Sequence, residues 1–165
     1  MPAIASLADI AALRETFWVE CKLALGRDGK GALPEDIWET YSAFANAQGG
    51  DIFLGLRELG PGHYELAGIA NPGKVVAELM AGVNDPRIVS TNLFCIDSVG
   101  ILDIDGRAVI HINVPQAPLY LRPVYIGSDP LHGSFVRSRD ADIKLDPDRV
   151  RRLQAKVRGE LLAKS

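Results

Sequence analysis

The stretch SAFANAQGGDIFLGLRE, residues 42–58, joins small residues, a double glycine and a run of apolar strand formers. Pro34 and the helically spaced residues up to Ala45 predict a helix that ends at Gly49-Gly50. The nearly continuous apolar run at 51–56 predicts a central strand, onto which the small residues let the helix pack closely. The glycines follow the helix, so the exposed backbone groups there are carbonyls, which repel anions. The stretch is therefore predicted to be scaffold and not a phosphate-binding loop.

Outward from this stretch, the chain alternates between helical and strand patterns. An N-cap pattern at Ser6 predicts a short helix through about Leu13, and Asp105-Gly106 is a strong hairpin signal. Further helices are expected at about 73–83 and 147–163, and strands at 17–23, 64–70, 92–97, 99–105, 108–114, 124–127 and 134–138. This mixture predicts an α+β fold with a mixed, largely antiparallel sheet packed with helices.

Length and composition favour one globular domain over residues 1–165, with a core at about 15–160 and a basic C-terminal helix at about 147–163. The start of the chain lacks the pattern of a secretory signal, and no apolar run approaches a membrane span. We therefore expect a cytoplasmic protein with no membrane partner. Cys21 and Cys95 lie in separate apolar runs and are expected to be small buried side chains, not a disulfide.

The net charge of −3 conceals an uneven distribution. Residues 122–165 carry 10 Lys and Arg against 6 Asp and Glu, so this segment is +4 while the rest of the chain is −7. A basic segment on an acidic chain is typical of a surface that meets phosphates, although a solvated helix face gives the same count.

The sequence lacks the residue patterns of a zinc site and of a Walker A nucleotide-binding motif. The three histidines, His63, His111 and His132, are scattered without zinc-ligand spacing, and His111 suits a hydrogen-bonded sheet position. The loop GRDGKG, residues 26–31, does not have the order of a Walker A motif and predicts a flexible basic loop.

Three carboxylates could serve a metal-dependent reaction. Glu15 and Glu20, with Lys22 nearby, could hold a divalent cation against a phosphodiester if Glu15 ends a helix and Glu20 belongs to the strand. Glu58, just past the central strand, could join them. The alternative is that Glu20 and Lys22 are a solvent-facing strand pair and Glu58 an ordinary turn residue.

The order of these motifs resembles the Schlafen AlbA-like domain, a family also labelled a DNA-binding or divergent AAA domain. The resemblance runs from about Phe17 to the C-terminal helix. It is carried by Glu20-Cys-Lys22, then ETYSAFANAQGGDIFLGLRE (39–58), YELAGI (64–69), INVPQAPLYLRPVYI (112–126) and GSFVRSRDADIKL (133–145). The pattern AFAN-x-x-GG-x-I-x-LG is its most specific part.

The resemblance implies an α+β core found in prokaryotic transcriptional regulators and in animal Schlafen proteins. Some Schlafen domains cleave tRNA and rRNA at a three-carboxylate metal site, whose positions match Glu15, Glu20 and Glu58. The third acid is an aspartate in those enzymes, so the longer Glu58 departs from the pattern. Those enzymes also pair two copies of the fold, which here would require a homodimer. The divergent AAA label implies no ATPase, because no Walker A motif is present.

Three functions follow, in order. The first is the nucleic-acid-binding domain of a transcriptional regulator, binding DNA or RNA. Its phosphate contacts would be Lys22, Arg27, Lys30, Arg137 and Arg139. An alternative for two of them is that Arg137 and Arg139 pair with Asp140 and Asp142. The second function is a metal-dependent RNA endonuclease with Glu15, Glu20 and Glu58 as catalytic and metal-binding residues, Lys22 as support, and Mg²⁺ or Mn²⁺ as cofactor. The third is a non-catalytic assembly or sensor module.

Overall fold

The computed structural model describes residues 3–24 and 31–164, which form two compact units. Of the described residues, 3–24, 31–35, 50–80 and 94–114 belong to the first unit, and 36–49, 81–93 and 115–164 to the second. The fold is mixed α+β with a mostly antiparallel main sheet, as the sequence predicts. The expectation of a single domain over residues 1–165 stays a prediction. No helix among the described residues is long and apolar enough to cross a membrane.

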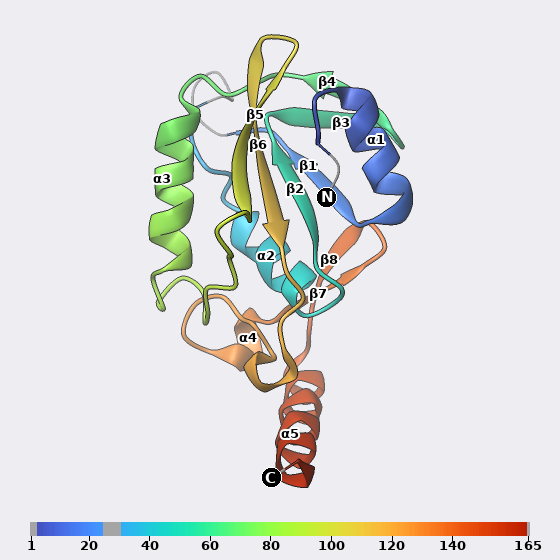
Figure 1. Cartoon of the computed structure of the whole chain (residues 1–165). Coiled ribbons are helices and arrows are strands. Elements are labelled where there is room, and N and C mark those ends of the chain that lie inside the picture. The colour runs from blue at the N-terminus through green and yellow to red at the C-terminus, as the bar shows by residue number, and fades with distance from the viewer. Residues whose placement is uncertain (1–2, 25–30, 165) are drawn as a thin grey trace. The chain divides into compact units, whose positions relative to one another are not determined.

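The first unit is built on a four-stranded sheet of order β1-β2-β6-β5 (Figure 1). Its strands are β1 (Val19–Lys22), β2 (Gly50–Leu54), β5 (Val99–Ile104) and β6 (Arg107–Val114). β2 is central, as predicted, and pairs parallel with β1 and antiparallel with β6. Asp105 and Gly106 both take positive φ at the tight turn between β5 and β6, which confirms the predicted hairpin.

The helix α1 (Leu7–Thr16) packs its apolar side on this sheet. Ser6 and Asp9 form a reciprocal capping box, as predicted, and the helix runs three residues beyond the expected end at Leu13. Buried residues from α1 and the strands form one core cluster: Ile10, Leu13, Val19, Phe53, Leu56, Ile104 and Val109. A hairpin of β3 (Leu56–Gly60) and β4 (His63–Leu66) completes the unit.

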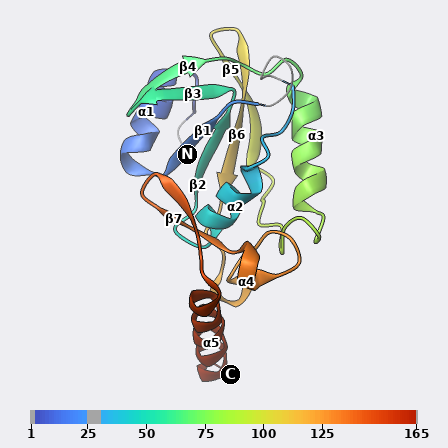
Figure 2. The same ribbon diagram turned by 180° about the vertical axis from the view of Figure 1, so that it is seen from behind.

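The second unit contains α2 (Ile37–Ala45), the 3₁₀ helix η1 (Leu119–Leu121), α4 (Pro130–Gly133) and α5 (Pro147–Ala163). α2 packs on β7 (Phe135–Ser138), and Figure 2 shows these two elements from behind. β7 pairs with β8 (Ala141–Lys144). The helix α3 (Pro72–Val83) ends within this unit. α5 begins with Pro147 after the N-cap Asp146, at the predicted position.

Four sequence expectations are wrong in detail. α2 begins at Ile37, after two turn residues, and not at Pro34. Residues 92–97 form no strand. Residues 124–127 form only isolated bridges, and Pro123 directly before them cannot donate to a sheet ladder. Cys95 is exposed, although Cys21 is half-buried as a free thiol.

Candidate nucleic-acid interface

The three carboxylates of the nuclease hypothesis lie on separate elements of the first unit. Glu15 is exposed on α1, Glu20 is half-buried on β1, and Glu58 lies on β3. Oε1 of Glu58 is 2.9 Å from Nε of Arg14 on α1, so the Glu58 carboxylate is neutralised by a cation of the same unit.

Strand geometry separates Glu20 from Glu58. Cys21 packs against the core cluster under α1, on the side where Glu58 meets Arg14. Glu20 precedes Cys21 in β1, and successive side chains of a strand point to opposite faces. Within residues 3–24 and 31–164, no three His, Cys, Asp or Glu side chains are grouped to hold a metal ion. The three carboxylates therefore do not fit a Mg²⁺ or Mn²⁺ site in this arrangement, and nuclease activity stays a prediction from sequence alone.

The surroundings of Glu58 are instead an electrostatic cluster at the edge of the core. Burial, followed by the negative charges of Glu58 and Glu20, raises the pKa of the Cys21 thiol to about 12. Burial also raises the pKa of Tyr64, which lies directly opposite Glu58 in the β3–β4 hairpin, to about 12. The hydroxyl of Tyr64 is buried without a hydrogen-bond partner among the described residues. This cluster ties α1 to the hairpin and favours neutral side chains at Cys21 and Tyr64.

His111 has the structural role that the sequence predicts. Nε2 of His111 lies 2.7 Å from Oδ1 of Asp51, and its ring stacks on Phe53 at 4.6 Å between ring centroids. His111 is therefore a hydrogen-bonded sheet residue, as predicted.

The residues predicted to contact phosphates differ in their exposure to solvent. Lys22 is half-buried on β1, while Arg27 and Lys30 lie outside the described residues. Arg139 is exposed in the turn between β7 and β8, where its φ is positive.

Arg137 is a buried structural cation and not a phosphate contact. Its Nη1 donates to Oδ1 of Asp142 at 2.8 Å, and its side chain is only 4% exposed. The guanidinium also lies over the ring of Phe44 at 5.1 Å, and its Nε donates to the carbonyl of Arg139. The pairing with Asp142 is the alternative that the sequence left open, and it corrects the assignment of Arg137 to the nucleic-acid-binding residues.

Exposed cations of the second unit are concentrated on α5. Arg149, Arg152 and Lys156 are all exposed and are spaced i, i+3 and i+7, so they share one side of the helix, away from the buried Val150 and Val157. We call these three residues the basic strip. None of the three has a carboxylate partner within residues 3–24 and 31–164, whereas the neighbouring Arg151 pairs with Asp148 at 3.0 Å.

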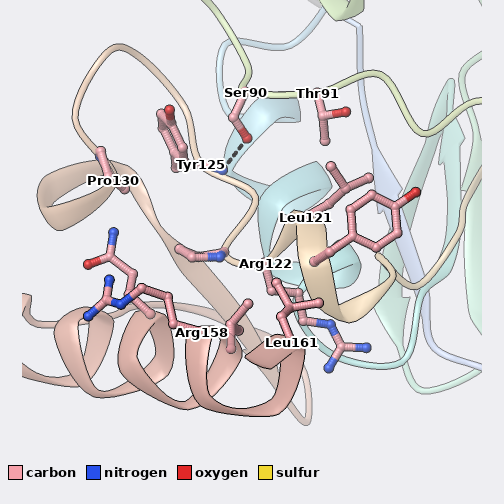
Figure 3. A pocket seen from close by; sticks show the side chains of 12 residues that line it. Ser90, Thr91, Leu121, Arg122, Tyr125, Pro130, Arg158 and Leu161 are labelled. Atoms are coloured by element: carbon pink, nitrogen blue, oxygen red, sulfur yellow. Dashed lines mark hydrogen bonds between the residues drawn. The ribbon is translucent and has the colours of Figure 1, made fainter. Parts of the chain in front are cut away.

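An open cavity of about 450 Å³ lies on the other flank of α5 (Figure 3). Its wall comes from three parts of the second unit: Ser90 and Thr91; Tyr120, Leu121, Arg122, Pro123, Tyr125 and Pro130; and the α5 residues Gln154, Val157, Arg158 and Leu161. In Figure 3, Leu161 rises from α5 toward the segment that carries Leu121 and Arg122, whereas the guanidinium of Arg158 points along α5 toward Pro130. We call this space the α5 cavity.

Hydrogen bonds from α2 fix the wall of this cavity. Oγ of Ser42 donates to the carbonyl of Val124 at 2.7 Å, and Nδ2 of Asn46 donates to the same carbonyl at 2.8 Å. Oδ1 of Asn46 accepts the Val124 N–H, and Oγ of Ser90 accepts the Tyr125 N–H at 3.0 Å. The polar side chains of the opening stretch thus hold the segment that follows Arg122, a role that the sequence reasoning missed.

The basic strip was visible as spacing within one helix, and the sequence reasoning noted its cations without assigning them. The α5 cavity carries no local signal, because its wall depends on bonds between residues about eighty positions apart.

The chain matches no protein-family model and no curated protein. Among solved structures, it is similar to the N-terminal domain of a RecG-related protein from Nitrosomonas europaea, a proposed ATP-dependent DNA helicase. The TM-score is 0.57 at 21% identity, over 81% of this chain and 88% of that domain. It is also similar to the DIP2311 protein from Corynebacterium diphtheriae, with a TM-score of 0.57 and 18% identity. That match covers 86% of this chain but only 24% of the DIP2311 chain. At these identities the matches establish a shared fold.

Proposed function

We propose that this chain is a nucleic-acid-binding domain of the Schlafen AlbA-like type, serving a transcriptional regulator. The observation that carries the proposal is the basic strip, where Arg149, Arg152 and Lys156 stand exposed without carboxylate partners in the described part of the chain. Cations spaced along one side of a helix can each meet a backbone phosphate, and every such contact releases counterions. Contacts of this kind give affinity without choice of sequence.

The contrast with other cations supports this assignment. Arg57, Arg87 and Arg137 are each held by a carboxylate at 2.8 to 2.9 Å, so their charge is satisfied within the protein. The positive charge of the basic strip is available to bind phosphates, and the strip lies within residues 122–165, the basic segment of the chain. The chain is similar in fold to the N-terminal domain of a RecG-related protein, which is described as a proposed ATP-dependent DNA helicase. This similarity is consistent with a nucleic-acid-binding role.

Binding to labelled single-stranded DNA, duplex DNA and RNA, followed by fluorescence anisotropy, tests the proposal. The double variant Arg152→Glu/Lys156→Glu should weaken binding to every probe by more than tenfold, because it turns attraction to phosphates into repulsion. The control Arg57→Glu/Arg87→Glu carries the same change of net charge away from the strip and should bind more tightly than the strip variant. Circular dichroism checks that both variants fold. Absent binding by the wild type, or equal loss in both variants, would refute the proposal.

A further inference from the structure

Two arginines line the α5 cavity, and no acid of the described residues neutralises them. Arg122 and Arg158 both line the cavity, and neither has a carboxylate within ion-pair distance in residues 3–24 and 31–164. By contrast, Arg87, Arg137 and Arg151 of the same unit are each paired with an aspartate. A cavity wall with two unneutralised guanidinium groups is a place where an anion gains charge-assisted hydrogen bonds.

Arg122 is also held in position. Its Nε donates to the carbonyl of Ala117 at 2.9 Å, across η1, which leaves both terminal nitrogens of the guanidinium for another acceptor. Arg158 comes from the opposite wall, on α5. The two guanidinium groups point to opposite ends of the cavity in Figure 3, so the wall offers positive charge at both ends.

The rest of the lining suits an aromatic ring with polar edges. Tyr120 borders the cavity and is 65% exposed, so the face of its ring is open to a flat partner. Ser90, Thr91 and Gln154 add donors and acceptors, while Leu121, Val157 and Leu161 add apolar surface. Oγ of Ser90 accepts the Tyr125 N–H, so its own proton can be donated to a ligand (Figure 3). The volume of about 450 Å³ lies in the range of small-molecule sites.

We propose that the α5 cavity binds a nucleotide. The base stacks on Tyr120, as bases stack on aromatic side chains in single-strand binding proteins, and the phosphate charge is met by Arg122 and Arg158. The nucleotide comes either free, as a nucleoside monophosphate, or as one unit of a single strand. The shared chemistry is a flat heteroaromatic ring joined to a phosphate.

This site is separate from the basic strip. Arg152 and Lys156 do not line the cavity, and Arg158 lies on the other flank of α5. The two proposals can thus fail independently, since strip variants test the binding of phosphate backbones and cavity variants test the binding of a single nucleotide.

Calorimetric titration with AMP, adenosine and inorganic phosphate tests the proposal. We expect AMP to bind at least tenfold more tightly than adenosine or phosphate, because only AMP offers both the ring and the charge. Arg158→Gln should weaken AMP binding about tenfold, the size expected for a hydrogen bond to a charged group. Arg122→Gln should do the same. Tyr120→Ala should weaken AMP binding and Tyr120→Phe should preserve it, because phenylalanine keeps the stacking face. Arg87→Gln, which removes a charge of the same unit away from the cavity, is the control and should bind as the wild type does.

A second arm distinguishes the sources of the nucleotide. Oligothymidylate binding that falls in Arg158→Gln and Tyr120→Ala identifies a nucleotide within a strand, whereas AMP binding with unchanged oligothymidylate binding identifies a free nucleotide. If neither AMP nor oligothymidylate binding responds to the cavity variants while they remain folded, the proposal is overturned. Since Arg158 is exposed on α5, its replacement leaves the core intact and keeps the test sound even if Arg122→Gln fails to fold.

Discussion

The guanidinium of Arg137 lies between the carboxylate of Asp142, at 2.8 Å, and the ring of Phe44, at 5.1 Å. Thr40 of α2 donates a hydrogen bond to the other oxygen of the same carboxylate. The pair therefore joins the β7–β8 hairpin to α2, and the most conspicuous basic motif of the sequence is part of the packing of the second unit.

Replacing Arg137 should unfold the protein more readily. Removing one partner of a buried ion pair leaves an uncompensated charge, so Arg137→Ala should lower the free energy of unfolding by about 3 kcal/mol. Urea unfolding followed by circular dichroism measures this value. The exposed neighbour Arg139 is the control, and Arg139→Ala should change the free energy of unfolding by less than about 0.5 kcal/mol. Equal losses of stability in the two variants would contradict a stabilising role for the buried ion pair of Arg137.

Replacing each of two helical glycines with alanine should change the free energy of unfolding in opposite directions. A Cβ at Gly82 would lie 2.3 Å from Cζ2 of Trp38, whereas a Cβ at Gly159 meets no atom within 4 Å. Gly82→Ala should therefore lower the free energy of unfolding by about 2 kcal/mol through overpacking. Gly159→Ala should raise it by up to about 1 kcal/mol, because alanine favours the helix. Thermal unfolding of both variants checks the signs, and a stabilised Gly82→Ala would contradict the close packing of Trp38.

The two thiols should react at very different rates. Burial and nearby carboxylates raise the pKa of Cys21 to about 12, so the reactive thiolate is scarce at a pH of about 8, while Cys95 is exposed. In the folded protein, Ellman's reagent should modify one cysteine quickly. Cys95→Ser should abolish the fast phase, and Cys21→Ser should leave it intact. A fast phase that follows Cys21 instead would place that thiol at the surface.

Stability should fall in alkali. Folding raises the pKa of Cys21 from an ordinary value of 9.0, and that of Tyr41 and Tyr64 from 10.0, to about 12 in each case. Since the folded state holds these protons more tightly, their contribution is present below a pH of about 9 and is lost as the pH rises toward 12. Urea unfolding at increasing pH should show this decline, and Cys21→Ala should show a shallower one. A free energy of unfolding that stays constant across this range would contradict the buried placement of these groups.

Much of the fold follows from local signals in the sequence. The capping box at Ser6, the Asp105-Gly106 turn and the Asp146-Pro147 helix start are each determined by a few adjacent residues, and the structure confirms them. The mixed α+β class follows from the alternation of helical and strand patterns.

The candidate site was harder to predict, because it depends on contacts across the chain. The exposure of Arg137 could not be judged without knowing that β8 places Asp142 beside it in the hairpin register. The separation of Glu20 from Glu58 follows from the side on which β1 presents Glu20, which is fixed only by the pairing of β1 with β2. The α5 cavity exists because Ser42 and Asn46 hold residue Val124, and no local pattern in the sequence indicates that bond.

The dependence of nucleic-acid affinity on salt tests the central claim most directly. A plot of log affinity against log salt for duplex DNA should be a falling line, with a slope of about 0.9 for each phosphate contact. Arg152→Ala/Lys156→Ala should reduce the magnitude of that slope by nearly 2, since two contacts are lost, while Lys74→Ala/Arg87→Ala should leave it as in the wild type. A slope that is the same in the strip variant and the wild type would contradict the assignment of the basic strip as the nucleic-acid-binding surface.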